Sequence, residues 1–593
     1  MKSAWRPLAA IIIIFASVLA AAGCVNVPTT GPIERVEGQQ PACQNCVNVV
    51  VAPPAPGDEP RQIVEGFLRA TSNYQPHYSV AKQFLSRMAA EKWSPEAGVT
   101  IYRGSPKAEG DSVTFDGWQV GSLGRDRSYA ASDQNLKWNF GVVQENGEWR
   151  IGNPPPGLMV AEYSFDSFYQ PYDLYFVGNG SSLVPDPIYL PALSNPANVA
   201  SALMKALLSG PSEWLAPAVS TAIPPDTSLS VDSVTITDGI AEVPLSDPVL
   251  DLPDPQRSLL AAQIVYTLRQ VGGVKGVLIR VNQQPYRAPG SDPNNLVIPV
   301  DAIPRDLDPI PLIAGQQLYS VRGGKVEQVT TTPDAPTPTP LPGALGGGEH
   351  AVDALAISVT NTDLAVITDG RTTLRRAPIA TGEPRTTLRR GVTDLLRPQF
   401  TRYGEIWDIG RQDGRQRMWM FTADDKRDKT FKINSPVLQD NGVTVTAFRI
   451  SPDGTRMALV RRTATGDQLG LARIIRSDKI VVDGWRALNI TQTNTPAIRA
   501  IADVAWLDGT ELLVLGAADA GTAYEVFRVA ADASRIAAQG GPDNWDAVEL
   551  AALPGTQSAI IVGRVGDTDQ TWKYNGNQWL PFIDKVSTIA YPG

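Results

Sequence analysis

Thiol groups are the first side chains to consider, because this 593-residue chain has only three cysteines. Cys24 follows an apolar run that extends from Leu8 to Ala22, and a glycine lies directly before it. A thiolate is a nucleophile, so a cysteine in this position could be alkylated by a lipid that fixes the chain to a membrane. Cys24 is therefore a candidate lipidation site.

The segment before Cys24 has the features of a secretory signal peptide. Lys2 and Arg6 give it a positive start, and an apolar stretch and small residues follow. The 15 apolar residues would rise roughly 22 Å as a helix, whereas a bilayer core is about 30 Å thick. We therefore interpret residues 1–23 as a signal peptide.

The sequence Ala-Ala-Gly-Cys resembles the bacterial lipobox, in which small residues precede a cysteine that receives lipid. Ala21 occupies the position where leucine is usual, and Leu19 lies two residues earlier. A buried free cysteine at the end of a core helix and an unlipidated secreted or signal-anchored protein are the alternatives. The resemblance implies that Cys24 is the first residue of the mature chain. Its diacylglyceryl and N-acyl groups would then enter the cell membrane from the extracytoplasmic face.

Cys43 and Cys46 form the sequence CQNC, which is followed by a proline-rich stretch. An even pair of cysteines outside the cytoplasm suggests a disulfide, and two free thiols are the alternative. A zinc site needs more ligands nearby, but the only histidines are His77 and His350. A thioredoxin-like redox site needs a β-α-β pattern around it, which is missing here.

Motifs that would indicate an enzyme are weak. Ser79 and Lys82 fit S-x-x-K, but the S-D-N and K-T-G motifs of penicillin-recognising enzymes do not occur. Neither a G-x-S-x-G, an H-E-x-x-H, a P-loop nor a G-x-G-x-x-G motif stands in a usable context. Paired carboxylates of a glycosidase cannot be screened by spacing and stay open. We predict a protein that is not an enzyme and has no cofactor and no metal.

The doublet TTLRR occurs twice, 14 residues apart, and places Arg375, Arg376, Arg389 and Arg390 on two predicted strands. Guanidinium groups bind carboxylates and phosphates in a bidentate manner. The four arginines are therefore a candidate contact for a cell-wall polymer or an acidic partner. Arginines on an ordinary exposed sheet surface are the alternative.

Charge and length limit the class of protein further. The formal net charge is −9, and the signal peptide removes two bases and no acid, so nucleic acid is an improbable partner. A chain of this length with 43 % apolar residues is expected to form several domains with real cores. Only the first apolar run approaches membrane-spanning length.

Three domains are expected after a flexible tether at residues 24–58, which is polar and proline-rich. Residues 59–165 begin with two predicted helices and continue with strands, among them a hairpin at Asn146-Gly147. Helices followed by a curved antiparallel sheet resemble the NTF2-like α+β cone. The second predicted helix includes Tyr78, Phe84 and Met88.

Residues 172–290 contain strands and two helices, the first of which ends at Gly210-Pro211. The phrases LLSGPS, TAIPPDTSLSVDSVTITDGIAEVPLS and IVYTLRQVGGVKGVLIRVN resemble the GerMN domain, which was first described in spore-germination proteins. The resemblance implies a small α/β interaction module of extracytoplasmic bacterial proteins.

Residues 310–593 repeat one pattern, a strand, a turn and a second strand. The equivalent turn residues are Ser358, Thr401, Ser451, Leu507 and Leu553, which lie 43 to 56 residues apart, and this period is typical of β-propeller blades. A further strand pair, QQLYSVRGGKVEQV, could close the ring, which gives five or six blades. The Pro/Thr/Gly-rich segment 330–350 is predicted to be a surface loop.

The order of lipobox, NTF2-like region, GerMN domain and propeller is similar to the actinobacterial LpqB lipoprotein family along nearly the whole length. This resemblance implies a lipoprotein on the outer face of the cytoplasmic membrane. It also implies a partner, the extracytoplasmic domain of an MtrB-like sensor histidine kinase of a two-component system linked to cell-wall and division control. A lipoprotein that binds or hydrolyses cell-wall glycan through the propeller is the alternative.

Overall fold

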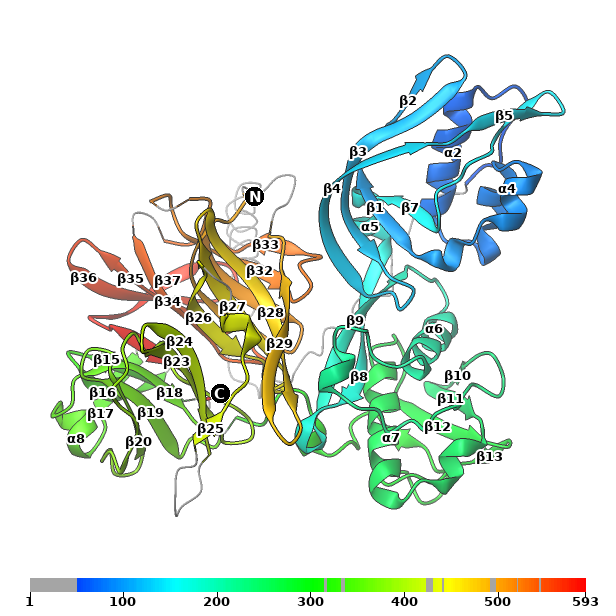
Figure 1. Ribbon diagram of the computed structural model, residues 1–593. Coiled ribbons are helices and arrows are strands. Elements are labelled where there is room, and N and C mark those ends of the chain that lie inside the picture. Colours follow the sequence, from blue (N-terminus) through cyan, green and yellow to red (C-terminus); the bar gives the residue numbers. More distant parts are fainter. Residues whose placement is uncertain are drawn as a thin grey trace, which may run out of the picture. The chain divides into compact units, whose positions relative to one another are not determined.

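The computed structural model describes residues 51–593 except for 314–316, 332–335, 423–429, 440–441, 491–496, 520 and 543–544. The predicted signal peptide, Cys24, Cys43, Cys46 and most of the predicted tether lie outside the described residues. Within the described part, no helix is both long and apolar enough to cross a membrane. The described residues form three domains, each with its own elements (Figure 1).

The N-terminal domain places helices against a curved sheet, as predicted for an NTF2-like cone. The sheet order is β2-β3-β1-β7, with β4 on β3, and β5 and β6 form a separate hairpin. Its helices are α2 (Pro60–Ser72), η1 (Pro76–Tyr78), α3 (Ser79–Gln83), α4 (Arg87–Lys92), η2 (Pro95–Ala97) and α5 (Glu162–Phe168). Its strands are β1 (Val99–Arg103), β2 (Pro106–Glu109), β3 (Ser112–Leu123), β4 (Tyr129–Asn139), β5 (Val142–Glu145), β6 (Glu148–Ile151) and β7 (Leu158–Ala161).

Helix α2 forms where the sequence predicted a helix. Glu59 and Gln62 make a capping box at its start, and its apolar face is buried against the sheet. The second predicted helix was wrong, because the chain bends between α3 and α4 and Met88 is exposed. The amide of Ser86 leaves the helical pattern and donates to the carbonyl of Ile151, which ties this bend to strand β6.

The second domain contains the predicted α/β module and a long hairpin, β8 (Tyr169–Val177) and β9 (Leu183–Pro191). Its main sheet has the order β10-β11-β12-β13, in which β11 and β12 are parallel and β14 pairs with β12. The remaining helical elements are η3 (Asn179–Ser181), α6 (Pro196–Leu208), η4 (Ala216–Ala218), η5 (Asp247–Asp251), α7 (Asp254–Leu268) and η6 (Arg305–Leu307). The strands of the main sheet are β10 (Thr235–Thr237), β11 (Ile240–Leu245), β12 (Gly276–Val281), β13 (Gln284–Pro285) and β14 (Ile298–Pro299).

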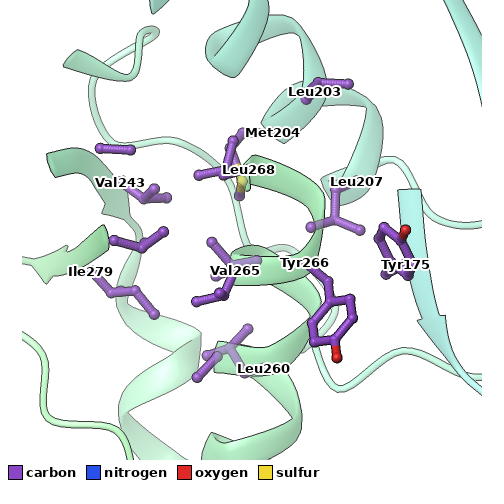
Figure 2. Close-up of a cluster of buried hydrophobic side chains, with 14 of the residues drawn as sticks. Tyr175, Leu203, Met204, Leu207, Val243, Leu260, Val265, Tyr266, Leu268 and Ile279 are labelled. Carbon is purple, nitrogen blue, oxygen red and sulfur yellow. The ribbon is translucent and has the colours of Figure 1, made fainter. Parts of the chain in front are cut away.

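Helix α7 is the centre of this second domain. Nine consecutive residues, 260–268, are buried, so the helix is enclosed by its neighbours rather than amphipathic. Figure 2 shows α6 on one side of it, Tyr175 of β8 on another, and Val243 and Ile279 of the sheet on a third. Two polar side chains on α7 are satisfied by β8, because Gln263 donates to the carbonyl of Tyr175 and Thr267 accepts from its amide.

The C-terminal domain is a β-propeller of six four-stranded blades. Blade 1 contains β38 (Thr588–Ala590), β15 (Leu318–Arg322), β16 (Lys325–Thr331) and β17 (Pro336–Pro340). Blade 2 contains β18 (Val352–Ile357), β19 (Asp363–Thr368), β20 (Thr373–Pro378) and β21 (Thr386–Arg389). Blade 3 contains β22 (Gln399–Phe400), β23 (Ile406–Gln412), β24 (Arg415–Phe421) and β25 (Thr430–Lys432).

Blade 4 contains β26 (Thr444–Ile450), β27 (Arg456–Thr463), β28 (Gly466–Arg476) and β29 (Ile480–Ala487). Blade 5 contains β30 (Ala500–Trp506), β31 (Glu511–Ala517), β32 (Glu525–Ala530) and β33 (Ile536–Ala538). Blade 6 contains β34 (Asp546–Ala552), β35 (Ala559–Val565), β36 (Thr568–Tyr574) and β37 (Trp579–Asp584). The five predicted turn residues each follow the first strand of a blade directly, so the predicted register is confirmed.

The ring is closed by pairing between the two ends of the domain, because C-terminal β38 pairs with β15. Six apolar clusters, one between each pair of neighbouring blades, hold the blades together. Each blade therefore depends on its neighbours for a complete core.

The predicted surface loop at 330–350 was wrong in part. Residues 336–340 form β17, the outer strand of blade 1, and residues 343–347 form the short helix α8 (Gly343–Gly347). Leu341 and Leu345 are buried between blades 1 and 2. Proline is tolerated at a sheet edge because an edge strand need not donate there, and the threonines between the prolines retain amide groups.

Candidate functional site

The structure does not gather the four predicted arginines into one site. Arg375 and Arg376 are neighbours on β20, so their side chains lie on opposite faces of the blade. Arg375 pairs with Asp369 at 3.1 Å, and Arg376 pairs with Asp363 at 3.1 Å. Arg389 ends β21, and exposed Arg390 follows it. The pairs on β20 are part of the blade surface, which is the alternative that the sequence left open.

Ser79 and Lys82 do not form a nucleophile pair. Ser79 is exposed at the start of α3, Lys82 is half-buried, and no hydrogen bond joins their side chains among the described residues. The described residues also contain no group of three or more His, Cys, Asp or Glu side chains that could hold a metal ion.

A cluster of buried charged side chains lies on, or directly before, the first strands of several blades, and it was not predicted from the sequence. Arg449 donates to Asp503 at 2.6 Å, and Arg397 lies 3.1 Å from Glu549 and 3.8 Å from Asp503. All four side chains are buried or nearly so. Arg397 also donates to the carbonyls of Leu550 and Ile589, and so joins blade 3 to blades 6 and 1.

A repeat alignment could have revealed this cluster. Arg397, Asp503 and Glu549 each stand four positions before the predicted turn residue of their blade. Blade 2 has alanine at the same position, Ala354. Because the first strands of all blades line the axis of the ring, charges of opposite sign at this position in different blades predict ion pairs across the axis.

The two carboxylates of this cluster are fully engaged. Asp503 accepts from Arg449 and from the amides of Val504 and Leu550. Glu549 accepts from the hydroxyl of Thr588 and the amide of Ile589. Burial lowers the pKa of Arg449 to about 10, although Asp503 favours its charged form.

A cavity of about 50 Å³ lies beside these residues and is lined by Arg397, Arg449 and Tyr591 among others. Pockets that hold small molecules usually have volumes of several hundred Å³, so this cavity suits water rather than a sugar. A glycosidase would need one carboxyl free to protonate a leaving group and another free to act as nucleophile or base. The carboxylates of Asp503 and Glu549 are both engaged in hydrogen bonds and ion pairs, so neither is free for these roles. The two residues stabilise the ring of blades instead.

A second unpredicted feature is the junction between the β8–β9 hairpin and the propeller. The Tyr189 hydroxyl donates to Asp532 at 2.9 Å and also contacts the hydroxyl of Ser534. Tyr403 donates to the carbonyl of Asn179 at 2.7 Å, and its hydroxyl lies 3.2 Å from that of Ser182. These contacts connect blades 5 and 3 to the two ends of the hairpin.

Trp214 forms a third part of the same junction, against blade 4. Its indole donates to the carbonyl of Gly484 at 2.7 Å, and Arg473 donates to its carbonyl at 2.6 Å. Arg486 lies over the indole ring and donates to the carbonyl of Tyr129 in the N-terminal domain. Residues of all three domains therefore meet at β28 and β29.

Carboxyl groups from both sides are enclosed at this junction. The pKa of Asp173 on β8 is raised to about 7, chiefly by burial and then by nearby Asp508, while Arg456 opposes the shift. Burial likewise raises the pKa values of Asp186 and Asp508. Arg456 is already paired with Asp453 at 2.7 Å, so the enclosed negative charge is only partly balanced.

A strained segment with an exposed aromatic side chain lies in the N-terminal domain. His77 and Tyr78 have φ values of 56° and 50°, which is unusual for two consecutive residues other than glycine. Tyr74 is 50 % exposed and contacts Tyr78, whose ring meets that of buried Trp93. The side-chain oxygen of Gln75 is buried without a hydrogen-bond partner.

Comparison with known families assigns each domain. Residues 53–166 match the profile of "Lipoprotein LpqB, N-terminal domain", residues 173–287 match "Sporulation and spore germination", and residues 328–592 match "Lipoprotein LpqB beta-propeller domain". Similar curated proteins include the lipoprotein LpqB of Cutibacterium acnes, 28 % identical over 96 % of both chains. The lipoprotein LpqB of Thermobifida fusca is 26 % identical over 96 % of this chain and 97 % of its own.

Among solved structures, TolB from Acinetobacter baumannii has a TM-score of 0.35 and 14 % identity, and it covers 55 % of this chain and 85 % of its own. One chain of a nidogen/laminin complex has a TM-score of 0.34 and 12 % identity, over 47 % of this chain and 98 % of its own. Likenesses at this level carry no information on function.

The fold and the junction define a multidomain protein in which an α+β domain and a germination-type α/β module are joined to a six-bladed propeller. Two of the matching family models, for the N-terminal domain and the propeller, are LpqB domains, and relatives named LpqB align with 96 % of this chain. The chain belongs to the LpqB lipoprotein family.

The inner-strand cluster is expected to be structural. Replacement of Glu549 by alanine (Glu549→Ala) would leave the buried Arg397 without its nearest carboxylate, which typically costs roughly 3–5 kcal/mol in the free energy of unfolding. The matched control is Asp569→Ala, which breaks a surface pair with Arg564 and should cost no more than about 1 kcal/mol. Thermal and urea unfolding measure both, and equal losses in the two variants would contradict the assignment.

The junction is expected to make stability depend on pH. Asp173 holds its proton more tightly in the folded chain (pKa about 7) than in the unfolded chain (about 3.8). The free energy of unfolding should therefore fall as pH rises from 4 to 7 and stay level above that. Asp173→Asn cannot ionise, so it should be more stable than the parent at pH 8, by about 4 kcal/mol at most, and similar to it at pH 4.

The control for this measurement is Asp301→Asn, at an exposed position of the same domain. Urea unfolding of both variants at pH 4, 6 and 8 gives the comparison. A stability difference between Asp173→Asn and the parent that is the same at all three pH values would refute this role of Asp173.

Proposed function

We propose that this LpqB-family chain is anchored to the outer face of the cell membrane by lipid on Cys24. In this proposal it is an accessory protein that modulates a sensor histidine kinase of the MtrB type, linked to cell-wall and division control. It contacts the extracytoplasmic domain of the kinase through its N-terminal domain. Its effect on the kinase comes from this binding and not from catalysis.

The observation that carries this proposal is the segment from Tyr74 to Tyr78. Two consecutive positive φ values cost about 1–3 kcal/mol each, and such strain persists only where the surroundings enforce it. The half-exposed Tyr74 continues an edge-to-face series of rings from the domain core to the surface. Aromatic side chains held in this way are common anchors of protein–protein interfaces.

Other features agree with a binding role. The carboxylates of the propeller's inner strands are used in structural ion pairs. The relatives are named as lipoproteins. A propeller and a germination-type module that are anchored beside a membrane protein would offer surfaces for binding a partner rather than a catalytic site.

The anchor has a direct test. Because two or more acyl chains hold a protein on a bilayer firmly, at about 0.8 kcal/mol per buried methylene, the parent should remain in the membrane fraction after a salt wash. Cys24→Ser should be released or left unprocessed, as seen by fractionation and mass spectrometry. Cys43→Ser is the matched control and should remain in the membrane. A parent protein that is cleaved but carries no lipid on Cys24 would refute the anchor.

The kinase contact is tested by co-purification from detergent-solubilised membranes. Tyr74→Ser should lower the recovery of the kinase by about ten-fold, because loss of an interfacial aromatic anchor commonly costs 1–2 kcal/mol or more. Tyr163→Ser is the control, since Tyr163 is 71 % exposed in the same domain. Unfolding curves confirm that both variants fold. Full recovery with Tyr74→Ser, or equal loss with Tyr163→Ser, would reject this surface as the contact.

A cell-wall-binding lipoprotein is the second candidate. It is favoured by exposed arginines on blade 3 of the propeller, among them Arg415 and Arg417.

A further inference from the structure

Strands of blades 2 and 3 bring together arginines that the sequence did not connect, and we call Arg389, Arg390, Arg415 and Arg417 the arginine cluster. On β24, residues 415, 417 and 419 lie on one face, because side chains alternate along a strand. The guanidinium of Arg389, from the outer strand of blade 2, lies 4.6 Å from the ring centre of Trp419. Arg389 also donates to Gln412, which pairs with Arg415 across β23 and β24.

These contacts fix Arg389 above the row formed by Trp419, Arg417 and Arg415. Gly410 is the partner of Arg417 in this row, and a Cβ atom there would come within 2.8 Å of Leu395. The absent side chain leaves room for Leu395 and the ring of Trp419, which pack over this position and hold blade 2 against blade 3. The opposite face of β24 is occupied, because Gln416 bonds to both the amide and the carbonyl of Val445 in blade 4.

Ion pairs within the described part of the chain do not balance the positive charge of the arginine cluster. Arg415 and Arg417 are exposed, and Arg390, which follows Arg389, is exposed as well. Neither these three nor Arg389 has an ion-pair partner among the described residues, whereas neighbouring Arg411 is paired with Asp394. The Nε atom of Arg389 is buried and has no acceptor among those residues either, so one strong donor is already desolvated and unused.

The spacing of the arginines indicates the kind of anion. Two exposed guanidinium groups two residues apart on a strand start roughly 7 Å from each other, which suits charges that repeat along an extended chain. A phosphodiester carries one negative charge and two oxygens that accept from guanidinium groups, and a polymer presents one such group in every repeat. Two guanidinium groups at this separation can each bind one charge of the polymer, whereas a single small anion would leave one of them unoccupied.

We propose that the arginine cluster of Arg389, Arg390, Arg415 and Arg417 binds a phosphodiester polymer. This site is separate from the kinase contact of the N-terminal domain. The identification of the polymer as part of the cell wall rests on the proposed extracytoplasmic location. The binding itself rests on the charge and spacing of the arginines.

The test uses the full chain in non-ionic detergent and a fluorescent oligomer of glycerol phosphate joined by phosphodiesters. Anisotropy should show binding that weakens as salt rises, because the contacts are between exposed charges. Arg415→Gln together with Arg417→Gln should raise the dissociation constant at least about ten-fold, since two charge-assisted contacts are lost. The matched control is Arg462→Gln with Arg499→Gln, which removes the same charge from two exposed arginines near blade 4.

Two competitors distinguish the source of the anion. Glycerophosphoglycerol, the headgroup of an anionic lipid, should compete poorly at equal phosphate concentration, and poly-glutamate should compete poorly at equal charge. Competition by the headgroup as strong as by the oligomer would overturn the polymer in favour of a lipid surface. Equal competition by poly-glutamate would overturn phosphodiester recognition. Lack of binding, or equal loss in the control variant, would overturn the site, and in each case the co-purification of the kinase remains a separate result.

Discussion

The β8–β9 hairpin is the element on which the arrangement of the domains depends, because its side chains belong to more than one core. Tyr169 and Tyr189 are buried among the aromatic residues of the N-terminal domain. Leu174 and Phe176 are buried in the core of the α/β module. Since one rigid hairpin fills parts of two cores, these domains cannot separate without exposing apolar surface.

The same hairpin is joined to the propeller by hydrogen bonds between polar groups. Tyr189 is apolar at its ring and hydrogen-bonded at its hydroxyl, so a single side chain joins the N-terminal core to Asp532. Polar junctions gain little net free energy and depend on the state of their charged groups. The enclosed carboxyls of Asp173 and Asp508 add such a dependence. The first two domains thus form one stable unit, whereas the stability of their contacts with the propeller depends on pH.

Much of the fold could be predicted from the sequence because its signals are local. The Asn146-Gly147 and Asp238-Gly239 turns both adopt positive φ values, as their composition predicts. The blade register followed from the spacing of the turns. The role of segment 330–350 could not be predicted, because composition predicts exposure, whereas blade closure recruits Leu341 and Leu345 into a core. The helix predicted across Phe84 failed for a similar reason, since pairing with the distant Ile151 bends the chain there.

The candidate sites were harder to predict, because they depend on which residues the ring brings together. The ion-pair partners of Arg375 and Arg376 belong to their own blade, so these two arginines are part of an ordinary blade surface. Arg389 stays a predicted anion contact, and its neighbours are on the next blade, more than 20 residues away in the chain. Repeat alignment can connect such residues when they share a position, as for Arg397, Asp503 and Glu549. It cannot connect residues from different strands of neighbouring blades.

The two ends of the propeller are therefore expected to differ in role. The turn that follows the first strand of blade 3 carries Tyr403, whose hydroxyl donates to the carbonyl of Asn179 in the hairpin and to that of Asp453 in the equivalent turn of blade 4. The turn between the second and third strands of blade 3 lies at the other end of those strands, directly before Arg415. Successive turns of a four-stranded blade alternate between its two ends, so the Tyr403 contacts and Arg415 lie at opposite ends of the blade. A ligand bound at Arg415 would consequently leave the hairpin contacts unobstructed.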